Sequence, residues 1–362
     1  MKIETIDRNF RAATVGDLDF QFTDVRQAPF ALEGFPWGDP DHPFCRLPPA
    51  MTEADVNAGA LQLGRHTTTG GAVRFRTDSP QIAIRAKLSH SSDMNHMPRA
   101  GSAGFDIYLG TGRDARHFGT AQPSPHEVDL VRVLAQAPQG GGLKDWCVNF
   151  PLYGGAESVE IGIRPGSRLE APAPHAVARP VLFYGSSITQ GGCASRPGNV
   201  YTSMLCRAVD APQINLGFSG SAKGEPAVAR AIASLDLAGF VMDYDHNAPS
   251  VEHLQQTHEP FFKLVREARP ELPILLLSRC DIWLDADEPS REANLERRDI
   301  VMRTYLNARA QGDRQVFFVD GIGLFGDQDR GACAVDRCHP NDLGFHRMFT
   351  YTLPILRTAL GV

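Results

Sequence analysis

Polar residues that could perform acyl-transfer chemistry follow several apolar runs in the second half of the chain. Ser186 and Ser187 come directly after the first run, and Asn247 follows the third. Asp336 and His339 lie just before the last helix-length segment. Hydroxyl, imidazole and carboxylate groups, with amide and backbone N–H donors, are what nucleophilic acyl transfer uses. A serine in such a turn can equally be a turn residue or a helix cap, so the surrounding elements must decide.

These elements have the pattern of an α/β domain. Apolar strands are predicted at 181–184, 214–217, 239–243, 274–278 and 316–320, with helices near 199–210, 225–236, 251–269, 291–311 and 342–360. Continuous apolar strands that alternate with helices predict a parallel sheet covered on both faces. We expect a flavodoxin-like five-stranded sheet, with its strand order left open. Turns after parallel strands lie on one rim, so the polar residues are expected to converge there.

The first half has a different pattern, with short alternating runs and Gly or Pro turn signals. Such runs without a long helical period predict an antiparallel, jelly-roll-like β-sandwich. The proline-rich segment 164–180 is the predicted linker, so we expect two domains, 1–175 and 176–362. The polar segment His90–Pro98 is predicted to be an exposed loop whose two histidines either touch a ligand or merely connect strands.

Composition limits the class of protein. The chain has 362 residues and a net charge of −6, and it has no basic stripe, which argues against a nucleic-acid partner. Residues 1–10 have no signal-peptide run, and no segment is apolar enough to span a membrane. The seven cysteines are scattered without a Cys-x-x-Cys pair, so neither a disulfide framework nor a zinc site is indicated. Cytoplasmic residence is the default expectation, with the oligomeric state left open.

The order of the motifs resembles that of the SGNH/GDSL hydrolase superfamily of esterases and acylhydrolases. Gly185-Ser-Ser-Ile188 stands where the family has Gly-Asp-Ser-Leu, and Asn215-Leu-Gly-Phe-Ser-Gly220 resembles the second block. Asn247 stands in the third block, without the usual Gly-x-Asn-Asp string, and Asp336-x-x-His339-Pro matches the last. Gly104-Phe-Asp-Ile-Tyr108 resembles the Gly-x-Asp-Leu-Tyr domain that precedes one bacterial branch of this superfamily.

The resemblance implies a role for each matched residue. Ser187 would be the nucleophile, His339 its base and Asp336 the partner of His339. The oxyanion would be bound by the backbone N–H groups of Ser187 and Gly220 and by the Asn247 side chain. No cofactor and no metal are implied.

The implied activity is hydrolysis of small acyl esters, such as acetate esters of a hydroxylated molecule or sugar. The predicted sandwich resembles a carbohydrate-binding module, which fits a carbohydrate ester. Two alternatives stay open: an acyltransferase with the same triad, in which an alcohol replaces water, and a carbohydrate-binding protein on a catalytically inactive hydrolase scaffold. A metal phosphoesterase is a more distant alternative.

Alternative roles also remain for residues near these motifs. Asp243, Asp245, His246 and His258 could form a metal cluster, although such residues more often cap helices. Cys193 and Cys338 could act as nucleophiles, although packing as small hydrophobic residues is the more common role.

The residues after His339 have alternative interpretations too. Asp342 could replace Asp336 as the partner of His339, or Asn341 and Asp342 could cap the last helix. The apolar residues expected on the buried stripe of that helix are Leu343, Phe345, Met348, Phe349 and Leu353.

Overall fold

The computed structural model describes residues 19–90, 92–138, 141–285 and 287–362. Residues 1–10, on which the prediction about a signal peptide rests, lie outside this part. So does residue 91 of the predicted loop. Within the described residues, the helices are too short or too polar to cross a membrane.

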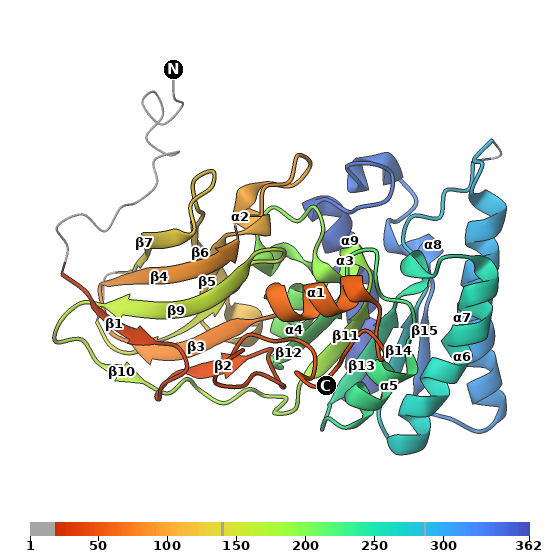
Figure 1. The fold of residues 1–362 in the computed structure, drawn as a ribbon, viewed down its shortest axis with the longest axis horizontal. Helices are drawn as coiled ribbons and strands as arrows, with labels where there is room; N and C mark the ends of the chain where they lie inside the picture. The colour runs from red at the N-terminus through yellow and green to blue at the C-terminus, as the bar shows by residue number, and fades with distance from the viewer. Residues whose placement is uncertain (1–18, 91, 139–140, 286) are drawn as a thin grey trace.

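A five-stranded parallel sheet forms the centre of the C-terminal half (Figure 1). Its strands are β11 (Val181–Gly185), β12 (Gln213–Gly217), β13 (Gly239–Asp243), β14 (Ile274–Leu277) and β15 (Val316–Val319). Their order is β12-β11-β13-β14-β15, which is the flavodoxin-like winding. The predicted fold class and all five predicted strands are confirmed.

Helices cover both faces of this sheet. They are α3 (Ser187–Gln190), α4 (Tyr201–Val209), α5 (Pro226–Ala233), α6 (Val251–Ala268), α7 (Arg291–Ala310), α8 (Gly321–Leu324) and α9 (Asp342–Leu360). Alternate residues of β11 point to opposite faces. Leu182 and Tyr184 belong to a core shared with α5, α6 and α7, whereas Val181 and Phe183 belong to a core shared with α4 and α9. The sheet is therefore buried on both sides, which explains its continuous apolar strands.

The N-terminal half contains two antiparallel sheets that face each other. The first has the order β1 (Gln21–Asp24), β9 (Gly155–Ile163), β4 (Gln81–His90) and β7 (Asp129–Gln136). The second has the order β10 (Leu169–Glu170), β3 (Ala72–Thr77), β8 (Lys144–Asn149), β5 (Phe105–Leu109) and β6 (Arg116–Ala121), with β2 (Ala31–Glu33) beside β3. One apolar cluster fills the space between them. The predicted antiparallel sandwich is confirmed.

The described residues of this half also form two short α-helices that the sequence pattern did not indicate. They are α1 (Ala58–His66) and the single turn α2 (Arg99–Ser102). Leu47, Val56 and Ala60, in and before α1, are buried in the core of the parallel sheet rather than in the sandwich. Hydrophobic packing therefore crosses the predicted division near residue 175, and that division stays a prediction.

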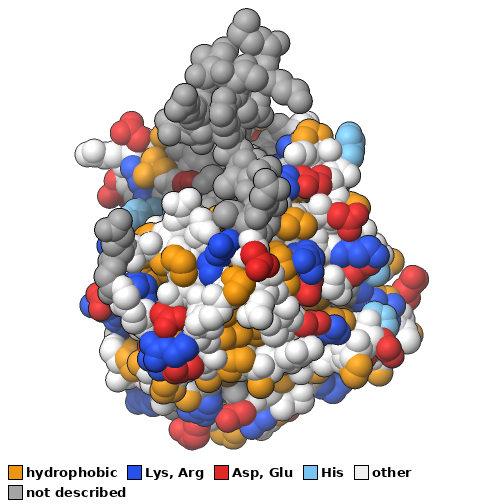
Figure 2. All heavy atoms as spheres, turned by 90° about the vertical axis from the view of Figure 1, so that its left-hand side faces the viewer, with side chains coloured by type: hydrophobic (Ala, Val, Ile, Leu, Met, Phe, Trp, Pro, Cys, Tyr) orange, Lys and Arg blue, Asp and Glu red, His pale blue; other side chains and the backbone are white. Residues whose placement is uncertain are grey.

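The surface at the sandwich end of the molecule is mixed in character. Figure 2 shows acidic and basic side chains interspersed over the described part of this face, with apolar side chains between them. Ion pairs of this half include Arg85 with Glu160 and Lys87 with Glu157. The charges on this face therefore compensate one another locally.

Candidate active site

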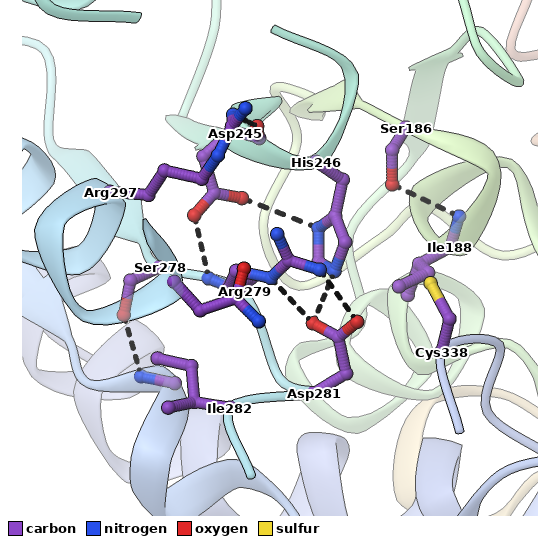
Figure 3. A network of polar contacts seen from close by, with 12 residues as sticks. Ser186, Ile188, Asp245, His246, Ser278, Arg279, Asp281, Ile282, Arg297 and Cys338 are labelled. Carbon is purple, nitrogen blue, oxygen red and sulfur yellow. Dashed lines mark hydrogen bonds and ion pairs between the residues drawn. The ribbon is translucent and has the colours of Figure 1, made fainter. Parts of the chain in front are cut away.

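The turn after β11 presents Ser187 and buries Ser186. Ser186 is the N-cap of α3, and its hydroxyl oxygen accepts a hydrogen bond from the Ile188 N–H at 3.2 Å (Figure 3). Its side chain is fully buried, whereas Ser187 keeps 8% of its surface exposed. A side chain at Gly185 would collide with Thr189 and with the Asp243 carbonyl, so a glycine is required before the two serines. Ser186 therefore fills the structural role, and Ser187 keeps a small exposed fraction.

Ser187, His339 and Asp336 form a continuous chain of hydrogen-bonding groups. Ser187 Oγ lies 2.9 Å from His339 Nε2, and His339 Nδ1 lies 2.7 Å from Asp336 Oδ2. The backbone N–H groups of Cys338 and His339 donate to Asp336 Oδ1 at 3.0 and 2.7 Å. Partial burial disfavours the charged carboxylate, but these donors and the imidazole together hold the pKa of Asp336 below its usual value. The geometry brings together the three residues expected from the sequence.

The loop that holds His339 is fixed by backbone contacts before α9 begins. The Val335 N–H donates to the His339 carbonyl at 3.0 Å, and Trp283 Nε1 donates to the Arg337 carbonyl at 2.8 Å. Asn341 is the N-cap of α9, because its side chain accepts from the Leu343 and Gly344 N–H groups. The imidazole is thus presented by a short, well-anchored loop.

Asp342 has a different partner from the one considered above. Its carboxylate accepts hydrogen bonds from the Ser195 N–H and from Asn199 Nδ2, both at 2.9 Å. It therefore joins the start of α9 to the segment after α3 and is occupied away from His339. Of the two candidate carboxylates, only Asp336 contacts the imidazole.

The turn after β12, which contains Gly220, lies against the turn after β13, which contains Asn247. The N–H of Phe218 donates to the Gly185 carbonyl at 2.8 Å, and that of Ser219 donates to Gln190 Oε1 at 2.9 Å, which sets the turn after β12 beside α3. Gly220 is exposed and has a φ of +67°, a left-handed conformation that suits glycine. Asn247 Oδ1 accepts from the Ala222 N–H at 3.4 Å, which leaves its Nδ2 group as a donor. Gly220 and Asn247 therefore belong to adjoining turns.

A buried ionic network supports the turn that contains Asn247 (Figure 3). His246 Nε2 lies 2.9 Å from Asp281 Oδ1, and Arg279 makes two hydrogen bonds of 2.7 Å with the same carboxylate. The Arg279 N–H donates to Asp245 Oδ2, and Arg297 donates to the Asp245 carbonyl. Burial disfavours the imidazolium, but the charge of Asp281 outweighs it and raises the pKa of His246 to about 9.

Only part of the possible metal cluster comes together. Asp243, Asp245 and His246 place one ligand atom each within 4.8 Å, and so do His246, Asp281 and Cys338. His258 lies apart, with Nδ1 2.8 Å from Thr304 Oγ1 and its ring stacked on Tyr244. The arginine and histidine side chains already balance the carboxylates of this network, so the charges are compensated by protein groups.

The two cysteines beside the site have high pKa values. Burial raises the pKa of Cys193 to about 11, and burial together with Asp281 raises that of Cys338 further. The thiolate is the nucleophilic form of cysteine, and both environments disfavour it. Compared with these two thiols, the Ser187 hydroxyl is the better candidate nucleophile, because it lies within hydrogen-bonding distance of His339.

Two residues of the N-terminal half approach the site. Tyr153 carries no signal in the sequence, whereas His96 is one of the two histidines of the His90–Pro98 segment for which a ligand contact was left open. The Tyr153 hydroxyl donates to the Ser187 carbonyl at 3.4 Å. The ring centroid of His96, in the loop predicted to be exposed, lies 6.2 Å from that of His339. The other histidine of that segment, His90, bonds the Tyr153 carbonyl through Nε2. No local spacing signals these contacts, because they join segments far apart in the sequence.

Family models match both halves of the chain. Residues 178–357 match the GDSL-like lipase/acylhydrolase family, and residues 20–169 match the N-terminus of SGNH-hydro-type esterases, named after its Gly-x-Asp-Leu-Tyr motif. None of the curated protein sequences matches the chain.

Several solved structures share the whole two-part architecture. A protein from Bacteroides ovatus described as a GDSL-like lipase is 25% identical, with a TM-score of 0.82 over 95% of this chain and 98% of its own. The salicylyl-acyltransferase SsfX3 of a tetracycline biosynthetic pathway is 20% identical, with a TM-score of 0.75 over 95% and 98%. An active-site mutant of a family two carbohydrate esterase from Clostridium thermocellum is 14% identical, with a TM-score of 0.63 over 92% and 99%.

The two family matches agree with the motifs recognised in the sequence, and the strand order agrees with the expected fold. The chain therefore belongs to the SGNH/GDSL hydrolase superfamily, in the branch whose hydrolase domain follows a Gly-x-Asp-Leu-Tyr domain.

Proposed function

We propose that the protein is a serine esterase that cleaves small acyl esters through a Ser187–His339–Asp336 triad. The observation that carries this proposal is the unbroken chain of contacts from Ser187 Oγ to His339 Nε2 and from His339 Nδ1 to Asp336 Oδ2. Each distance is short enough for a proton to pass or to be held between the two groups.

Acylation begins when His339 takes the proton of the Ser187 hydroxyl as Oγ attacks the ester carbonyl. Asp336 holds the proton on Nδ1, so that Nε2 is free to act as the base, and it stabilises the imidazolium that forms. His339 then gives the proton to the leaving alcohol, and the acyl group stays on Ser187 Oγ. A water molecule, deprotonated by the same imidazole, attacks the acyl-enzyme and releases the acid.

The developing oxyanion needs donors on the side of Ser187 away from His339. We assign this role to the backbone N–H groups of Ser187 and Gly220 and to the Asn247 side chain. Support comes from the adjoining turns of Gly220 and Asn247, and from the contact of Asn247 Oδ1 with the Ala222 N–H, which directs its amide toward this rim. Removing one such donor typically lowers turnover by about 10²–10³.

A carbohydrate or another hydroxylated molecule is the proposed source of the ester. The solved structures of similar fold include family two carbohydrate esterases, one of them in complex with cellohexaose. The same two-part architecture occurs in a salicylyl-acyltransferase, so transfer to an alcohol is the second candidate. Both activities share the acyl-enzyme and differ in the acceptor that enters afterwards.

Steady-state hydrolysis of p-nitrophenyl esters from acetyl to octanoyl, with acetylated sugars alongside, tests the proposed function. We expect wild-type activity to be highest on short acyl chains and to be abolished in Ser187→Ala and His339→Ala proteins that remain folded by circular dichroism. Full activity of a folded Ser187→Ala variant would contradict the proposal. Adding an alcohol acceptor and measuring the ratio of transferred to hydrolysed product separates the transferase from the esterase.

A further inference from the structure

A loop of the N-terminal half reaches the imidazole proposed to act as the base. His96 lies between β4 and α2, and its ring centroid is 6.2 Å from that of His339, with the ring planes tilted by 59°. Its side chain is exposed, and the described residues provide its Nε2 with no hydrogen-bond partner. The two rings are close enough that one bound molecule could contact both of them.

The loop around His96 is anchored to the C-terminal half of the chain. Met97 is 5% exposed and packs in the same core cluster as Ile188, the residue after Ser187. Ser102 Oγ donates to the Ser92 carbonyl at 2.6 Å, and Arg99 Nε donates to Asp93 Oδ1 at 2.7 Å. His96 is therefore presented by an anchored segment, which reduces the entropy that a ligand contact would cost.

His96 lies where the alcohol portion of the ester is expected to bind. His339 must protonate the leaving oxygen, so that oxygen has to lie within hydrogen-bonding distance of His339 Nε2. The proposed oxyanion donors, at Gly220 and Asn247, come from other turns of the rim. A side chain next to His339 therefore meets the alcohol portion of the ester rather than its acyl chain.

The hydrogen bond to Asn95 sets the chemistry of the His96 ring. His96 Nδ1 lies 2.7 Å from Asn95 Oδ1, and a carbonyl oxygen can only accept. Nδ1 therefore carries the proton in the neutral ring, and Nε2 is an acceptor. An acceptor beside a leaving alcohol favours an alcohol that has a second hydroxyl group to donate.

We propose that His96 is a specificity-determining residue that accepts a hydrogen bond from a free hydroxyl group of the leaving alcohol. This inference rests on the proposed function and names a residue that would favour esters of polyols and sugars over esters of simple alcohols. It also assigns a role in recognition to the N-terminal half of the chain.

Kinetics of the full-length chain on two matched acetate esters test the inference. 1-Acetylglycerol and n-propyl acetate share the acyl group and the carbon chain and differ in the free hydroxyls, and acetate release is followed in a pH-stat. We expect His96→Ala to lower kcat/KM on 1-acetylglycerol by about fivefold to tenfold, the value of one hydrogen bond, and to leave n-propyl acetate within about twofold. His96→Gln, which keeps an acceptor, should recover part of the loss. His126→Ala removes another exposed histidine beside Asp93 and should leave both rates unchanged.

Other results would contradict either the role of His96 or the proposed function. Equal wild-type kcat/KM on the two esters, or an equal loss on both in His96→Ala, would overturn the role of His96 in recognising a hydroxyl. Unchanged kinetics on both esters would overturn the contact itself. If p-nitrophenyl acetate is not cleaved in a Ser187-dependent way, the proposed function fails instead, so the two failures are distinguishable.

Discussion

Arg46 Nη1 donates to the Asn215 carbonyl at 2.8 Å, across 169 positions of sequence, and so joins the N-terminal half to β12. The Arg46 side chain is fully buried, and its five hydrogen bonds all go to carbonyl or hydroxyl oxygens, Gly217 O and Thr67 Oγ1 among them. No carboxylate of the described residues pairs with it. Burial accordingly lowers its pKa to about 9.

We expect Arg46→Met to destabilise the protein strongly. The substitution leaves several buried carbonyls without donors, and each such group costs about 1–3 kcal/mol, so the free energy of unfolding should fall by about 3 kcal/mol or more. Urea unfolding followed by tryptophan fluorescence measures this. Arg179→Met, at an exposed ion pair with Asp236, is the matched control and should change the free energy by less than about 1 kcal/mol. An unchanged unfolding midpoint for Arg46→Met would contradict the argument.

Asp336→Asn should reduce kcat on p-nitrophenyl acetate by about 10³–10⁴, because an amide cannot hold His339 in the required tautomer or stabilise the imidazolium. Asp342→Asn is the comparison, because Asp342 follows His339 in the sequence but its carboxylate bonds Ser195 and Asn199. This substitution should lower kcat far less. A larger loss in Asp342→Asn than in Asp336→Asn would reverse the assignment.

Ser186→Ala separates the roles of the two adjacent serines. Ser186 caps α3 through the Ile188 N–H, so its loss should lower the free energy of unfolding by about 1 kcal/mol and leave most of the esterase activity. Ser187→Ala should have the opposite profile, with little change in stability and no activity. Both quantities are measured on the same preparations. An inactive Ser186→Ala together with an active Ser187→Ala would transfer the nucleophile to Ser186.

Stability should depend on pH through His246. Its pKa is raised from 6.5 to about 9 in the folded state, so the folded protein binds the proton more tightly than the unfolded chain. The resulting stabilisation is complete below pH 6.5 and is lost as the pH rises through about 9. Wild-type free energy of unfolding should therefore decline between these values, and His246→Gln should decline less. Parallel pH profiles for the two proteins would contradict the proposed ionic network.

Much of the C-terminal half could be predicted from the sequence because its strands are buried on both faces. The five apolar runs are unambiguous in such a sheet, and each is followed by the polar turn that the rim requires. The apolar stripe predicted to be buried on α9 differs from the structure at one residue. Leu343 is 40% exposed, because it lies in the first turn of α9, while Phe345 and Met348 face the core.

The features that sequence reasoning missed depend on contacts between distant segments. Helix α1 is short, and its buried face meets the parallel sheet rather than its own sandwich. Arg46 and Tyr153 gain their significance from partners in the other half of the chain, Asn215 for Arg46 and Ser187 for Tyr153. Neither spacing nor periodicity encodes such contacts, so only the assembled fold reveals them.

The most direct test of the triad is covalent labelling by a serine-directed phosphonate, with the adduct located by peptide mass spectrometry. The proposed mechanism predicts one adduct, on Ser187, whose formation is abolished in Ser187→Ala and greatly slowed in His339→Ala. Labelling that persists in Ser187→Ala, or a wild-type protein that resists the phosphonate while it hydrolyses esters, would contradict the central claim.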